Sequence, residues 1–110
     1  MPEFRQPEEM AVDESGEGWT LSTLAGPSQV RGLRMAARRW DLVGGARSPV
    51  RQGDRGAERF LYVIRGEGRA LIGGDRLELG RESVVWLEQH DDYSLEAGPD
   101  GLEVLEARSD

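Results

Sequence analysis

The chain has 110 residues, enough for one domain with a modest core, since only 37% of them are hydrophobic. All 14 basic residues are arginine and there is no cysteine, which excludes Schiff-base chemistry, thiolate nucleophiles and thiolate metal sites. A net charge of −7 argues against nucleic acid and anionic membranes as partners, and one histidine cannot supply a site that needs several imidazoles.

Most of the negative charge lies in residues 1–18, which hold six acidic residues and one arginine, a net charge of −5. The other residues therefore carry only −2 of the total. We expect residues 1–18 to be a solvated acidic arm, or to add an edge strand on this chain or, by swapping, on a partner subunit. Residues 19–110 then form the single folded domain.

Glycine and proline recur at short intervals, and no long segment keeps a helical period, so the chain is expected to form short strands. The predicted strands are residues 18–24, a strand of eight to ten residues around 34–40, then 58–64, 69–72, 76–79, 83–87, 93–97 and 102–107. Glycines predict a hairpin at 72–76, a tight turn at 98–101 and a corner or bulge at 66–68. Short strands without helices predict an all-β, antiparallel sandwich or barrel.

Residues 58–74 read ERFLYVIRGEGRALIGG, after a glycine turn at 43–46 and before an apolar run at 82–88. Over residues 33–106 this pattern resembles the strand–corner–strand core of the cupin superfamily, in its small, single-domain, type-2-like form. The resemblance implies a jelly-roll β-barrel. It also implies two motifs that place metal ligands inside the barrel mouth.

The first cupin motif runs histidine-x-histidine, three or four residues, glutamate, six residues, glycine. If Gly66 is its last residue, Arg59 replaces the glutamate and Glu58 lies one residue early, on the opposite face of the strand. A gap of four residues places Gln52 and Asp54 at the histidine positions. Other gaps place Gly53 and Arg55, or Arg51 and Gly53, at these positions, so no register supplies a histidine.

The second motif runs glycine, five residues, proline-x-glycine, two residues, histidine. Anchored on Gly80, its histidine position falls on Asp91; anchored on the apolar run 84–87, it falls on Tyr93. We prefer Tyr93, because a one-residue slip would turn the buried face of the strand outward. The resemblance therefore implies the fold without the metal site, and we expect no metal or other cofactor.

Arg59 and Tyr93 are the main candidates for a replacement site. A buried guanidinium needs a partner, which predicts an internal salt bridge with Asp54, Glu58 or Glu103, or a bound carboxylate ligand. Tyr93 is either core filling or a hydrogen-bond donor and acid. We include Gln52, Asp54 and Trp86 among the candidate ligand-binding residues.

His90 is the other candidate for acid–base chemistry, with Glu58 as a second possible base. It lies in the polar turn 88–92, which also fits a solvent-exposed histidine. An alternative is a divalent ion held by His90, Glu88 and either Asp91 or Asp92, although adjacent residues rarely converge on one ion.

Residues 59, 61 and 63 share one strand face and residues 60, 62 and 64 the other, and both faces are largely apolar. A small domain with two apolar faces predicts a homodimer, in which Trp40, Phe60, Tyr62 and Trp86 lie in the core or the interface. No run approaches about 20 apolar residues and no signal-peptide pattern is present, so we expect a cytoplasmic protein.

These observations predict a metal-independent barrel that binds a small polar or anionic molecule. It either only binds that molecule or catalyses a proton transfer of the isomerase, lyase or cyclase type, with Tyr93, His90 and Glu58 as the catalytic candidates. The alternative is a non-catalytic dimeric regulatory or interaction module. A metal-dependent cupin oxygenase or isomerase with atypical ligands is the third hypothesis.

Overall fold

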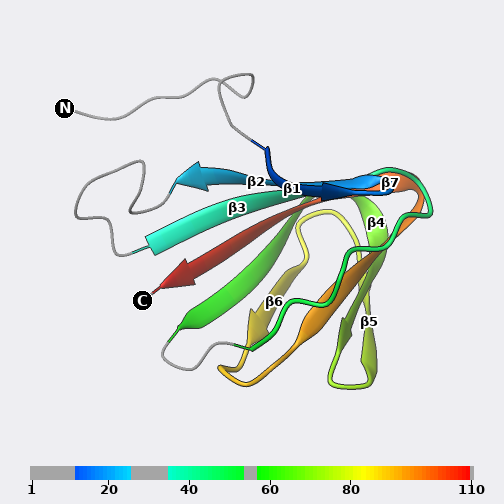
Figure 1. Ribbon diagram of the computed structural model, residues 1–110. Helices are drawn as coiled ribbons and strands as arrows, with labels where there is room; N and C mark the ends of the chain where they lie inside the picture. Colours follow the sequence, from blue (N-terminus) through cyan, green and yellow to red (C-terminus); the bar gives the residue numbers. More distant parts are fainter. Residues whose placement is uncertain (1–11, 26–34, 54–56, 110) are drawn as a thin grey trace.

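The computed structural model describes residues 12–25, 35–53 and 57–109, which consist of strands, turns and connecting segments (Figure 1). The strands are β1 (Val12–Gly16), β2 (Trp19–Ala25), β3 (Met35–Leu42), β4 (Glu58–Ile72), β5 (Asp75–Leu79), β6 (Val84–Leu87) and β7 (Tyr93–Ser109). In these ranges no helix capable of crossing a bilayer occurs. The predicted all-β, antiparallel fold is confirmed.

The two longest strands, β4 and β7, bend and contribute to both layers of the fold. The first half of β4, residues 58–66, and the second half of β7, residues 102–109, belong to a large sheet in the order β1-β2-β3-β7-β4-β6. The other halves, residues 68–72 and 93–97, pair with each other in a small sheet that also contains β5. Residues 47–51, between β3 and β4, border this small sheet through bridges to β7.

The core lies between the two sheets. Side chains from both layers meet there, and the largest that are fully buried are Trp40, Tyr93, Leu21, Leu61, Leu95, Val63 and Val104. Burial along β4 alternates as expected, because residues 59, 61 and 63 are buried and residues 60 and 62 only partly so. This alternation orients Arg59 toward the interior.

The corner predicted at 66–68 is confirmed, but it lies within one strand. The β4–β7 register shifts between Val63 and Arg65 and again between Gly66 and Gly68. Gly66 has a φ of 90°, and a Cβ there would lie 2.2 Å from the carbonyl oxygen of Gly101. Only glycine therefore fits at this point, where β4 passes from one sheet to the other.

The tight turn predicted at 98–101 is wrong, because the chain does not reverse there. Gly66 pairs with Leu102 and Gly68 with Ala97, so residues 98–101 form a bulge opposite the single residue Glu67. The extra residues allow β7 to follow the bend of β4, and the strands predicted at 93–97 and 102–107 are one strand.

The other predicted strands are confirmed as β2, β3, β5 and β6, with ends that differ by a few residues. The hairpin between β4 and β5 turns at Gly73 and Gly74, both with positive φ. Of the acidic segment, residues 12–16 form β1 and pair with β2 of the same chain, whereas residues 1–11 lie outside the described residues.

Candidate functional site

Polar residues occupy one end of the interior face of the large sheet. Glu106 of β7 lies between Leu61 of β4 and Arg38 of β3. Two residues further toward the end of β7, Arg108 pairs with Arg59 of β4. The apolar rows begin immediately behind them, where Val63 and Trp40 flank Val104. Arginines and one carboxylate therefore cluster where the start of β4 meets the end of β7.

Tyr93 joins this cluster to the core. Its hydroxyl donates a hydrogen bond to Oε2 of Glu106 and accepts one from Nε1 of Trp40 at 3.0 Å. Burial raises the pKa of Tyr93 well above its usual value, and the negative charge of Glu106 and the hydrogen bond to it raise this pKa further. Tyr93 therefore keeps its proton near neutral pH, as a donor to Glu106.

Arg59 is buried, with 3% of its surface exposed, and the hydrogen-bond partners that the structure describes for it are carbonyl groups. Its guanidinium donates to the carbonyl of Asp91 at 2.6 Å, and more weakly to those of Gln52 and Glu88 at 3.3 and 3.4 Å. Asp54 lies outside the described residues.

The two other expected carboxylate partners lie elsewhere. Glu58 is exposed, and Glu103 forms an ion pair with Arg65 at 2.8 Å on the outer face of the sheet. Arg59 thus ties the segment before β4 to the β6–β7 turn. It does so with a positive charge that no described carboxylate neutralises directly.

Two buried donors at this end of the sheet have no acceptor. They are the Nε atoms of Arg38 and Arg59, and no other described side chain has a buried nitrogen or oxygen without a hydrogen-bond partner. Leaving such a donor unsatisfied costs about 1–3 kcal/mol. Positive groups with unused donor capacity at a barrel end favour the binding of an anion.

A hollow of about 180 Å³ opens beside this cluster, and we call it the arginine hollow. It is lined by Arg51, Gln52, Gly53, Arg59, Glu106 and Arg108. Among the described residues of this lining, Glu106 supplies the one carboxylate, and it accepts the Tyr93 hydrogen bond. Arg51 extends over the Trp40 ring, 5.9 Å from its centroid, and contacts Glu14 of β1 at 2.9 Å.

The structure brings Arg59, Gln52 and Tyr93 together and places the other described candidates elsewhere. His90 is 76% exposed in the β6–β7 turn, where its Nε2 lies 3.6 Å from Glu88 and 3.8 Å from Asp91. Trp86 is 72% exposed on the outside of the large sheet and packs against Phe60 with ring centroids 5.1 Å apart.

Glu106 is one of the site residues that the sequence analysis missed. It follows Leu102 and Val104 on the interior face of β7, where it interrupts an apolar, alternating pattern. A charged residue on a buried strand face was the signal that could have identified it.

The side chains at the arginine hollow do not fit the divalent metal ion that the two cupin motifs would bind. Three of the four usual ligand positions hold Gln52, Arg59 and Tyr93, which supply one amide, one cation and one phenol that keeps its proton; the fourth, Asp54, lies outside the described residues. No group of three or more histidine, aspartate or glutamate residues that could hold a metal ion occurs in the part of the chain that the structure describes.

The carboxylates of the β6–β7 turn have other partners. One oxygen of Asp91 accepts a hydrogen bond from the backbone N–H of Glu88 at 2.9 Å, and Asp92 accepts one from Gly53 at 2.7 Å. These bonds shape the turn and join it to the segment before β4.

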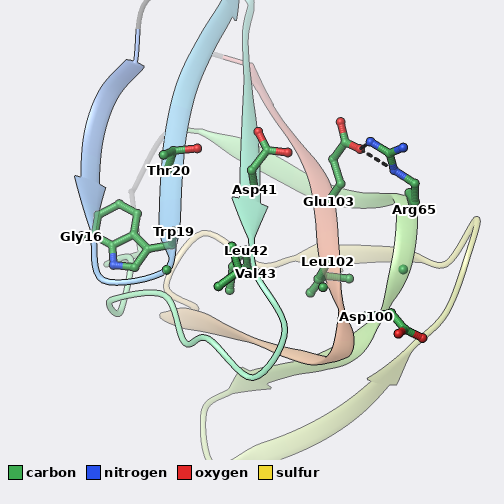
Figure 2. Close-up of a pocket in the computed structure, with 13 residues that line it drawn as sticks. Gly16, Trp19, Thr20, Asp41, Leu42, Val43, Arg65, Asp100, Leu102 and Glu103 are labelled. Carbon is green, nitrogen blue, oxygen red and sulfur yellow. Dashed lines mark hydrogen bonds and ion pairs between the residues drawn. The ribbon is translucent and has the colours of Figure 1, made fainter.

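A larger hollow of about 670 Å³ lies at the other end of the large sheet (Figure 2). Thr20, Asp41, Glu103 and Arg65 line it in one row across four strands. Its two carboxylates in this row are already paired, Asp41 with Arg39 at 3.0 Å and Glu103 with Arg65 at 2.8 Å. We therefore take the arginine hollow as the candidate site, because the buried Nε of Arg59, one of its lining residues, has no acceptor.

No protein-family model matches this chain, and no curated protein matches it in sequence. Solved structures do match. An RmlC-like cupin from Shewanella frigidimarina superposes with a TM-score of 0.78 at 18% identity, over 99% of this chain and 91% of that one. The chain has the cupin fold.

Other cupin-fold structures that match differ in function. Ectoine synthase from P. lautus gives a TM-score of 0.76 at 16% identity, over 98% of this chain and 78% of the enzyme. The cupin domain of an XRE family transcriptional regulator from Enterobacter cloacae gives 0.73 at 16%, over 84% of this chain and 97% of that domain. Likeness at these identities shows the fold alone, so the function must be argued from the site.

Proposed function

We propose that this cupin-fold protein binds a small carboxylate anion in the arginine hollow and that it does so without a metal ion. The observation that carries the proposal is the lining, whose described residues include three arginines, Arg51, Arg59 and Arg108, and one carboxylate, Glu106. Guanidinium groups bind carboxylates through paired, charge-assisted hydrogen bonds. The Arg59 Nε without an acceptor supports the same reading.

The size of the hollow limits the ligand. At about 30 Å³ for each water, 180 Å³ corresponds to roughly six water molecules. Small dicarboxylates such as malonate suit this space, because each end can bind a separate guanidinium. If the protein also catalyses a proton transfer, Glu106 is the base we propose, since it lines the hollow and Tyr93 retains its own proton.

Calorimetric titration with malonate tests this proposal. We expect the wild-type protein to bind malonate and the Arg51→Gln variant to bind it at least tenfold more weakly, because one of the surrounding charges is lost. Arg51 is partly exposed, so the variant should fold normally. Equal affinities of the two proteins, or no heat with malonate, succinate or phosphate, would refute the proposal.

We also propose that two copies of the chain associate through the outer face of the large sheet. Phe60, Tyr62 and Leu105 lie there on neighbouring strands, beside Trp86 (72% exposed) and Val84 (50% exposed). Two ion pairs also lie on this face, Arg39 with Asp41 and Arg65 with Glu103. Paired charges reduce the repulsion between two copies of a protein with a net charge of −7, and sheets commonly pack face to face.

Sedimentation measurements test the dimer. Trp86→Glu places a charge in the middle of the apolar face and is expected to give monomers at concentrations where the wild type is dimeric. Val50→Glu adds the same charge at another exposed apolar residue, 60% exposed, and should leave the dimer intact. A monomeric wild type, or a dimeric Trp86→Glu variant, would contradict the proposed interface.

A further inference from the structure

Arg51, which lines the arginine hollow, forms an ion pair with Glu14 of β1. Both oxygens of Glu14 approach the same atom, Nη1 of Arg51, at 2.9 and 3.3 Å. Glu14 pairs with Leu21 across the β1–β2 ladder, and Leu21 belongs to the buried core. Glu14 therefore contacts Arg51, a lining residue of the hollow, from the edge strand of the large sheet.

The ion pair between Glu14 and Arg51 is partly exposed to solvent. All residues of β1 are exposed, and the side chains of Glu14 and Arg51 are 44% and 26% exposed. Ion pairs of this kind contribute little to stability, because water screens the charges and both side chains lose freedom. Glu14 can therefore leave Arg51 without disrupting the core.

A ligand carboxylate that binds Arg51 end-on requires both Nη atoms of the guanidinium. Glu14 already occupies Nη1, and its negative charge also repels a second anion at the same place. We propose that Glu14 is a built-in competitor, which sets the affinity of the arginine hollow by competing with the ligand for Arg51. This inference rests on the proposed binding of a carboxylate in the hollow.

The test is a malonate titration of the Glu14→Gln variant at low ionic strength. Loss of the competing charge is expected to raise the affinity for malonate about three- to fivefold. Asp13→Asn is the matched control, because it removes the same charge from the adjacent residue, whose carboxylate accepts a hydrogen bond from Thr23. The control should change the affinity less than twofold.

A double-mutant comparison shows whether Arg51 mediates the effect. In the Arg51→Gln background, Glu14→Gln is expected to change the malonate affinity less than twofold. Equal gains from Glu14→Gln and Asp13→Asn would indicate a general charge effect and overturn the inference, as would a gain that persists without Arg51. Wild-type binding with an unchanged Glu14→Gln affinity rejects only the competitor, whereas no binding by any of these proteins rejects the proposed function and the competitor together.

Discussion

Replacing Arg59 by methionine is expected to lower the free energy of unfolding by about 2–4 kcal/mol and to abolish malonate binding. Methionine fills similar space but cannot donate to the carbonyls of Asp91, Gln52 and Glu88, which Arg59 holds at 2.6–3.4 Å. The segment before β4 and the β6–β7 turn would then lose their common partner. Urea unfolding followed by tryptophan fluorescence measures the change.

Arg69→Met is the control for this substitution on the same strand. Arg69 is 45% exposed and pairs with Glu78 at 3.1 Å on the surface, so its loss is expected to cost less than about 0.5 kcal/mol. An Arg59→Met variant that is as stable as Arg69→Met would show that the buried cation contributes nothing net. Retained malonate binding in that variant would remove Arg59 from the site.

Alkaline unfolding is expected to report on Tyr93. Tyrosine in an unfolded chain ionises near pH 10, whereas burial and Glu106 raise the pKa of Tyr93 well above that value in the folded protein. Above pH 10 the unfolded chain therefore binds fewer protons than the folded one. The contribution of Tyr93 to the free energy of unfolding is fully present below pH 10. It falls as the pH rises beyond 10, by up to about 1.4 kcal/mol for each pH unit.

This chain is well suited to the measurement, because it has no lysine or cysteine and only two tyrosines. Tyr93→Phe is expected to be less stable than wild type by about 1–3 kcal/mol at neutral pH, since Glu106 loses its donor and Trp40 its acceptor. The difference should shrink above pH 10, where only the wild type loses the Tyr93 contribution. Tyr62→Phe, the control, should retain the alkaline loss; parallel curves for wild type and Tyr93→Phe would contradict this account.

The fold followed closely from the sequence because its signals are local. Alternation on residues 59–63 gave the buried face of β4, and Gly73 and Gly74 gave the hairpin that follows. The error at 98–101 arose because glycine and proline suit a chain reversal and a bulge equally well. The bend of β4, a long-range partner, decides between them.

The candidate site was only partly predictable. Arg59 and Tyr93 were found because the resemblance to cupins directed attention to their positions, and both side chains are buried there. Glu106 and Glu14 were not, because the role of each depends on register across the sheet. The carbonyl partners of Arg59 could not be inferred from the sequence. Every residue has a backbone carbonyl, so the residue types do not show which carbonyls lie near Arg59.

The central claim is that the barrel binds a carboxylate without a metal ion, and one titration tests it most directly. Wild-type protein is dialysed against a chelator, its metal content is measured, and malonate is titrated before and after divalent metal is added back. The account predicts saturable binding by the metal-free protein and the same affinity after metal is restored. Binding that appears only with metal would contradict it.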